Sequence, residues 1–245
     1  MLTSLSLFAA AAEMPWFLRI YQFFKTGGLF MIPLLLCSVI AVTVTIMRAV
    51  ALRRHLVIPS ELEKEIERLQ PHDTPESVVR LARMARNDTS TLGRVAQVGI
   101  GNLHLPKEEN MNAVQTVARH EIVQLERGLH ILEIIIGIAP LIGLLGAVSG
   151  LIAVFGAFGN SQNSQDPQRI ASGIAEALST TVVGLAIAIP SLIAHGVLMK
   201  KVEQMAADME LLMSGLMAKC YNQKNRRGAP VASAYDFEPE PEPGQ

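Results

Sequence analysis

The stretch that decides the fold is IIIGIAPLIGLLGAVSGLIAVFGAFG at 134–159, followed after a polar loop by ASGIAEALSTTVVGLAIAIPSLIAHGVLM at 171–199. No Asp, Glu, Lys or Arg occurs from Ile134 to Gln165 or from Ala177 to Met199. Each run is long enough for a helix that crosses a bilayer, which needs roughly 20 apolar residues. One carboxylate, Glu176, lies near the start of the second run. The sequence therefore predicts two membrane-spanning helices, one of which carries an acid.

A third charge-free run extends from Thr26 to Met47 and ends at Arg48. Three such runs, with the charges gathered between them, are typical of an all-α integral membrane protein. The net charge of −1 gives no reason to expect a nucleic-acid partner. Cys37 and Cys220 are remote in sequence and lack metal-ligand spacing, so we expect neither a disulfide nor a zinc site.

The distribution of Lys and Arg predicts the orientation of the spans in the membrane. Cations gather after the first span, before the second and after the third: Arg48, Arg53, Arg54, Arg119, Arg127, Lys200 and Lys201. The loop between the second and third spans holds only Arg169. By the positive-inside rule the N-terminus is outside, whereas the region 48–133 and the C-terminus are cytoplasmic.

The sequence predicts a different structure for each successive segment of the chain. Residues 1–25, with aromatic rings and cations from Trp16 onward, predict an outside segment with an interfacial helix, and their apolar start lacks the basic region of a signal peptide. The predicted order is then a span at 26–47, a cytoplasmic helical region at 48–133, a span at 134–158, an outside loop at 159–170, a span at 171–199, a cytoplasmic helix at 200–222 and a disordered tail at 223–245 with Glu-Pro repeats.

Within the region 48–133, Thr74-Pro75-Glu76 predicts a helix start and 87–91 a break between helices. From Pro106 an apolar spacing of three or four residues leads into the second span, so we expect one continuous helix there. After the third span a similar spacing continues through Leu198, Val202, Met205, Met209, Leu212 and Leu216. Two long helices are thus expected to extend from the membrane into a helical bundle or an oligomer.

Small and polar residues recur at spacings of three and four in both long runs, which places them on one face of each helix. In the later run they are Ser172, Gly173, Glu176, Thr180 and Gly184, and in the earlier one Ala139, Gly143, Gly146, Ala147, Gly150 and Ala157. Such faces let two helix backbones approach closely, and Gly146 and Gly150 have GxxxG spacing. Pro140 and Pro190 each remove a helix hydrogen bond and can kink their spans.

Glu176 admits two interpretations. An acid at membrane depth costs on the order of 3 kcal/mol on insertion scales, so it is normally functional or hidden in an assembly. In the first interpretation it lies at the lipid headgroup level, close to the polar loop. In the second it is a protonatable group that faces an internal cavity, with Ser149, Ser179, Thr180 and Thr181 as neighbouring hydroxyls. Each hydroxyl can instead bond the backbone of its own helix.

The runs APLIGLLG at 139–146 and GIAEALSTT at 173–181, followed by Gly184 and by AIP at 188–190, resemble the MotA/TolQ/ExbB proton-channel family, and its ExbB branch most closely. The two runs together are far more specific than a lone GxxxG. The three spans and the large region between the first two extend the resemblance to most of the chain.

The resemblance implies a homopentamer in the inner membrane of a Gram-negative bacterium, with a central pore that holds a dimer of a single-span ExbD-like partner. Protons would be the coupling ion, with no cofactor, and their flow would energise a TonB-like protein for outer-membrane transport. Glu176 and Thr181 fall on the family's glutamate and threonine positions. The further proton-pathway candidates are Thr180, Ser149 and Ser179, and the helix-packing and pore-lining candidates are Pro140, Gly143, Gly146, Ala147, Gly150, Gly173, Gly184 and Pro190.

One departure from the family pattern is Ala147, which stands where the family usually has a second threonine. Ser149 or Thr180 could take over that role. Two alternative functions stay open: a TolQ-like subunit that serves envelope integrity, and a non-conducting membrane scaffold, which Ala147 favours. We expect no enzymatic activity, because the sequence has no nucleophile elbow, phosphate-binding loop or metal-ligand cluster.

Overall fold

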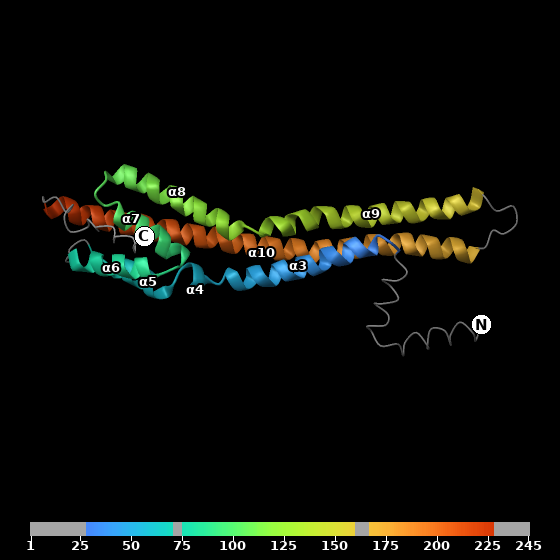
Figure 1. Cartoon of the computed structure of the whole chain (residues 1–245), viewed down its shortest axis with the longest axis horizontal. Coiled ribbons are helices and arrows are strands. Elements are labelled where there is room, and N and C mark those ends of the chain that lie inside the picture. Colours follow the sequence, from blue (N-terminus) through green and yellow to red (C-terminus); the bar gives the residue numbers. More distant parts are fainter. Residues whose placement is uncertain (1–27, 71–74, 160–166, 228–245) are drawn as a thin grey trace, which may run out of the picture. The chain divides into compact units, whose positions relative to one another are not determined.

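The computed structural model of the protein describes residues 28–70, 75–159 and 167–227 (Figure 1). Those ranges are almost entirely α-helical and contain no strand, which confirms the all-α prediction. The predicted interfacial helix within 1–25, most of the outside loop and the C-terminal tail from 228 onward lie outside the described residues.

The described chain divides into two compact units. The first, here called the span unit, comprises residues up to Ile46 together with Gly128–Gly196. The second, the bundle unit, comprises Met47–Arg127 and the residues from Val197 onward.

Three helices are long and apolar enough to cross a membrane, at Met31–Ala51, Leu129–Gly156 and Gly173–Asn222. They belong to α3 (Met31–Ala51), α9 (Leu129–Gly159) and α10 (Pro167–Arg227), which Figure 1 labels. The protein is therefore an integral membrane protein with three spanning helices, as predicted.

The helix bounds differ from the predicted segments at several ends. Helix α3 begins at Met31 rather than at residue 26, because Gly28 has a positive φ of 66° and its carbonyl accepts from the Met31 amide at 3.2 Å. Helix α10 already begins at Pro167, within the predicted outside loop, and continues to Arg227, past the predicted start of the tail. Lys and Arg are favourable near a helix C-terminus, which accounts for the longer helix at this end.

The expectation of one continuous helix from Pro106 into the second span is wrong. The structure has α8 (Lys107–Glu126) and α9 as separate helices, with Gly128 between them at a φ of 104°. A positive φ suits glycine and breaks the helical hydrogen-bond pattern. The apolar spacing of the sequence continues through Gly128, but the α-helix does not.

The bundle unit contains α4 (Arg54–Val57), α5 (Ser60–Arg68), α6 (Pro75–Asn87), α7 (Thr91–Gly101), α8 and the last part of α10. Helix α6 begins at Pro75, the predicted first helical position, and the predicted break at 87–91 separates α6 from α7. Ser90 caps α7, because its Oγ accepts from the Gly93 amide at 3.0 Å. An added Cβ at Gly93 would lie 2.7 Å from the carbonyl oxygen of Asp88, so this turn requires glycine.

The core of the bundle unit lies along α10. All the residues of its predicted apolar spacing are buried: Leu198, Val202, Met205, Met209, Leu212 and Leu216. Helix α7 packs closely on this surface, since an added Cβ at Gly99 would lie 2.7 Å from the Met217 methyl carbon. The corresponding face of α8 is less covered: Met111, Ala118 and Ile122 are half-buried and, with α10, line a groove of about 760 Å³.

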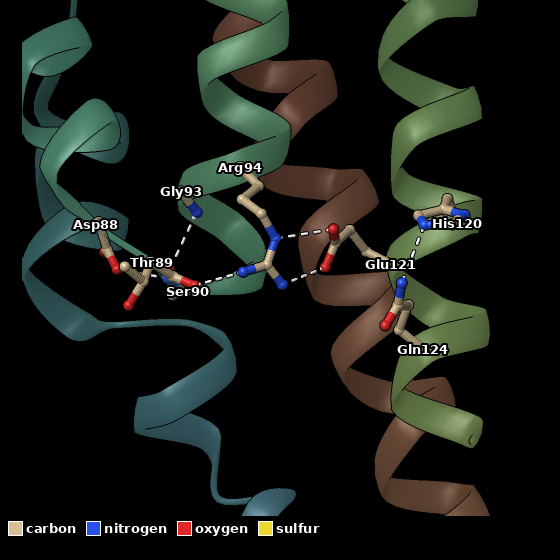
Figure 2. Close-up of polar contacts among 8 residues, drawn as sticks. All are labelled: Asp88, Thr89, Ser90, Gly93, Arg94, His120, Glu121 and Gln124. Carbon is tan, nitrogen blue, oxygen red and sulfur yellow. Dashed lines mark hydrogen bonds and ion pairs between the residues drawn. The ribbon is translucent and has the colours of Figure 1, made fainter. Parts of the chain in front are cut away.

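A partly buried ion pair joins α7 to α8, and Figure 2 shows Arg94 pointing across to Glu121. The Arg94 Nε donates to Glu121 Oε1 at 2.8 Å, and Nη2 donates to Oε2. The remaining Nη1 donates to the Thr89 carbonyl at 2.5 Å. The Glu121 side chain is only 9% exposed, and its hydrogen bonds raise the pKa of the Arg94 guanidinium above its usual value. The pair is bidentate, the strongest geometry for a carboxylate and an arginine.

Candidate functional site

Helices α9 and α10 pack closely in the span unit along their small-residue faces. An added Cβ at Gly184 would lie 2.6 Å from the Ala139 carbonyl oxygen, and one at Gly143 would lie 2.8 Å from the Thr180 carbonyl oxygen. Real Cβ contacts are longer than these distances, so the backbones are closer than any side chain would permit. Glycine on both helices is therefore what allows this approach.

The same close packing extends along the rest of the α9–α10 seam. An added Cβ at Gly150 would lie 3.1 Å from the Ala177 Cβ, and one at Gly173 would lie 2.1 Å from a Val154 methyl. The contacts pair later residues of α9 with earlier residues of α10, so the two helices run antiparallel. The GxxxG pair Gly146 and Gly150 lies on this seam.

Two threonine hydroxyls of α10 converge on one carbonyl of α9. Thr180 Oγ1 lies 3.1 Å from the Gly143 carbonyl oxygen and 2.8 Å from that of Ala177 in its own helix, while Thr181 Oγ1 lies 3.3 Å from the Gly143 oxygen. Thr180 is 2% exposed, so its hydroxyl is enclosed within the seam. A hydroxyl has one proton to donate and two lone pairs to accept with. Thr180 thus shares its proton between two carbonyls and keeps acceptor capacity.

Glu176 occupies a position on α10 about one turn before Thr180, while its side chain lies outside the described residues, as does that of Ser172. The other candidates fall into two groups. Gly143, Gly146, Gly150, Gly173, Gly184, Thr180 and Thr181 meet at the seam. Pro140, Ala147 and Ser179 are half-buried, and Ser149 and Pro190 are exposed.

The exposure of Ser149 separates it from the threonines. It contributes no hydrogen bond to them among the described residues, whereas Thr180 lies directly on the Gly143 carbonyl. Of the two hydroxyls considered as replacements for the threonine missing at Ala147, Thr180 is therefore the one within the seam. Its distance to the Ala177 carbonyl also shows the local backbone bonding that is common for threonine in helices.

The sequence analysis missed His195, a titratable side chain within the third predicted span. The run 177–199 is charge-free only with respect to Asp, Glu, Lys and Arg, and histidine is not among these four. A count that includes histidine would have found it. The structure places it half-buried on α10.

Within the described ranges no cluster of three or more His, Cys, Asp or Glu side chains is placed to hold a metal ion. The polar groups placed at the α9–α10 seam are the hydroxyls of Thr180 and Thr181 and backbone carbonyls, with the acidic position Glu176 about one turn before Thr180.

Comparisons with known proteins agree with this arrangement. The pattern of the MotA/TolQ/ExbB proton channel family matches residues 87–211, which include the close contacts of α9 with α10. A Synechocystis protein named as an ExbB-like biopolymer transport protein is 33% identical over 197 residues, which cover 78% of this chain and 76% of that protein. The chain therefore belongs to the MotA/TolQ/ExbB proton channel family.

Proposed function

We propose that this chain is the ExbB-like subunit of a motor in the inner membrane of a Gram-negative bacterium, driven by the proton-motive force. In this proposal a homopentamer holds a dimer of a single-span ExbD-like partner in its central pore. Proton flow through the complex moves the partner and energises a TonB-like protein for outer-membrane transport. The N-terminus is periplasmic and the bundle unit is cytoplasmic, as the Lys and Arg distribution predicts.

The observation that carries this proposal is the α9–α10 seam within the region matched by the family. There the acidic position Glu176 precedes by about one turn a threonine pair that converges on the Gly143 carbonyl. A carboxylic acid and fixed hydroxyls in a low-dielectric setting supply the groups that a proton path needs. The similarity to an ExbB-like protein over most of both chains supports the ExbB assignment.

The energy available limits how the motor works. Each proton that crosses the membrane releases about 2.3 kcal/mol per 100 mV of potential. One proton therefore cannot perform much mechanical work, and we expect several protons to pass for each cycle of the partner.

The role of Glu176 is tested by the substitution Glu176→Gln, which keeps the shape of the side chain and removes its proton. We expect loss of TonB-dependent uptake in cells, with the pentamer and its partner still recovered together on size-exclusion chromatography. The matched control is Glu133→Gln, because Glu133 is an exposed carboxylate on α9 and its loss should leave uptake unchanged. Full uptake in the Glu176→Gln cells would refute the proton role.

Two other functions give different results in the same strains. A TolQ-like subunit would restore outer-membrane integrity in a TolQ-deficient strain and leave an ExbB-deficient strain without uptake. A non-conducting scaffold, the function that Ala147 favours, would not depend on a residue that carries protons. The Glu176→Gln substitution would then leave the phenotype of the cells unchanged. The genes beside this one also discriminate, since an ExbD-like reading frame favours the motor and a Tol-type operon favours the TolQ assignment.

A further inference from the structure

His195 lies on the inward seam of α10. Residues spaced by three and four along α10 from Ala177 form one stripe that includes His195. All the members of this stripe except His195 are buried: Ala177, Thr180, Gly184, Ala188, Ser191 and Leu198. The residues that flank His195 off this stripe, Ile193 and Val197, are 63% and 56% exposed. The imidazole therefore occupies the protein-facing side of the helix and is half-buried.

The distance between His195 and Glu176 corresponds to the thickness of a membrane. Both lie on α10, and a rise of about 1.5 Å per residue separates them by ~28 Å along the helix. The hydrocarbon core of a bilayer is roughly 30 Å thick. One helix thus carries a carboxylic acid near one boundary of the membrane and an imidazole near the other, on the side where Lys200 and Lys201 follow.

Polar groups lie beside α10 one turn before His195. A groove of about 250 Å³ between α3 and α10 is lined mostly by apolar side chains, with the hydroxyl residues Ser38, Thr45 and Ser191 among them. Ser191 Oγ donates to the Ile187 carbonyl at 2.7 Å, so its lone pairs stay available to accept. Pro190 has no amide proton, which deprives the Ala186 carbonyl, also in this groove, of its helical donor. The groove thus offers a few hydrogen-bond acceptors about one turn before His195 on α10.

The imidazole itself has no hydrogen-bond or ion-pair partner among the residues that the structure describes. Because α9 runs antiparallel to α10, the first turns of α9 lie at the level of His195. Their titratable groups, His130 and Glu133, are exposed and bond one another at 3.1 Å. The charged residue of α3 is Arg48, which lies in the last turn of that helix. On α10 itself, the charged residue closest in sequence to His195 is Lys200. An ionisable side chain within a span and without a structural partner is a candidate functional residue.

We infer that His195 is a second proton-exchanging residue of the channel, at the end of the route that the charge distribution assigns to the cytoplasm. This inference rests on the proposed function. One ring nitrogen of the neutral imidazole takes the excess proton of a hydronium ion in the route, which leaves water, and the other nitrogen then releases its proton to the aqueous side. Exchange of tautomers then restores the starting state, so one proton enters and one leaves. Imidazole suits this step because it exchanges protons in the physiological pH range.

The test is the substitution His195→Ala in the complete complex, reconstituted in vesicles of phosphatidylethanolamine and phosphatidylglycerol. We expect proton flux, followed with a pH-sensitive dye, to fall about tenfold and to recover most of its value when imidazole is added on the side of the bundle unit. The rescue is counted only above the rate that imidazole gives in protein-free vesicles, because free imidazole itself carries protons across lipid. His104→Ala is the matched control, because His104 is an exposed histidine of the bundle unit and its removal should leave flux unchanged.

Two further variants make the result decisive. The size-matched His195→Gln removes titration and keeps bulk and polarity, so flux should fall as in His195→Ala even where the alanine variant assembles poorly. Unchanged flux in His195→Gln, or a loss in an assembled His195→Ala complex that imidazole does not restore, would overturn the inference. The Glu176→Gln variant separates the two proposals. If the Glu176→Gln complex conducts no protons while the His195→Gln complex is fully active, only the role of His195 is refuted. If the Glu176→Gln complex is active, the proposed function is refuted.

Discussion

Among single residues, Thr180 has the best-defined geometry at the candidate site. Its hydroxyl is enclosed between the Gly143 and Ala177 carbonyls, and Glu176 precedes it by about one turn of α10. A hydroxyl held in this way helps to fix how α10 is rotated against α9. It therefore influences which way the acidic position faces, whether or not a proton passes through it.

We expect Thr180→Val to destabilise the α9–α10 packing by about 0.6–1 kcal/mol, the usual value of one interhelical hydrogen bond in a membrane. Valine has nearly the same shape, so the loss reports the hydroxyl. The measurement is unfolding in mixed detergent micelles. Thr43→Val is the control, because the Thr43 hydroxyl is exposed and bonds only its own helix at Val39. Equal stability of the two variants would show that the Gly143 contact contributes nothing.

The sequence predicted which residues share a face but not what covers that face. The spacing of Thr180, Gly184 and Glu176 follows from helical periodicity, whereas the partner of Thr180 depends on how α9 docks, which no local pattern encodes. His195 was missed for a chemical reason, since it was counted as uncharged. The family resemblance supplied the positions of Glu176 and Thr181, and periodicity alone would not have distinguished them from other polar residues.

At the scale of helices, the close approach of α9 and α10 depends on glycine. We expect Gly184→Ala to destabilise the span unit by about 1–3 kcal/mol, because its Cβ would press on the backbone carbonyl of Ala139. Gly196→Ala on the same helix is the matched control, since an added Cβ there meets nothing within 4 Å, and alanine should be neutral or slightly stabilising. Thermal unfolding in detergent measures both variants, and a tolerated Gly184→Ala would contradict the packing described here.

The Arg94–Glu121 ion pair holds α7 against α8 in the bundle unit. We expect Glu121→Gln to destabilise the bundle unit by about 1–3 kcal/mol, less than the 3–5 kcal/mol typical of a fully buried pair, because Arg94 is 48% exposed. Denaturant unfolding of the whole chain, monitored by circular dichroism, gives the change. Glu133→Gln, which breaks an exposed pair with His130, should shift the midpoint little. Equal midpoints for the two variants would mean that burial adds nothing to the Arg94–Glu121 pair.

Helix starts were easier to predict than helix continuity. Proline and a capping residue have local effects, so the start of α6 at Pro75 and the break before α7 could be predicted from the sequence. Gly128 lies inside an apolar spacing that suits a continuous helix, and only its positive φ reveals the break. Glycine adopts both signs of φ readily, so its type alone does not decide between the two outcomes.

For the whole molecule, composition and the charge-free runs were sufficient to predict three membrane spans, and the structure agrees. Assembly is less accessible to such reasoning. The half-buried face of α8 and the groove beside it show that the protomer leaves apolar surface uncovered in the bundle unit. The family implies a pentamer, but sequence periodicity cannot indicate which surfaces meet a neighbouring subunit and which meet lipid.

The measurement that bears most directly on proton conduction is dye-monitored proton flux through the reconstituted complex, with Glu176→Gln compared with the unaltered protein at equal protein content. We predict a potential-driven flux in the unaltered complex that falls to the level of protein-free vesicles in the Glu176→Gln complex, with the pentamer intact. Undiminished flux in the assembled Glu176→Gln complex would contradict a proton path through this acid.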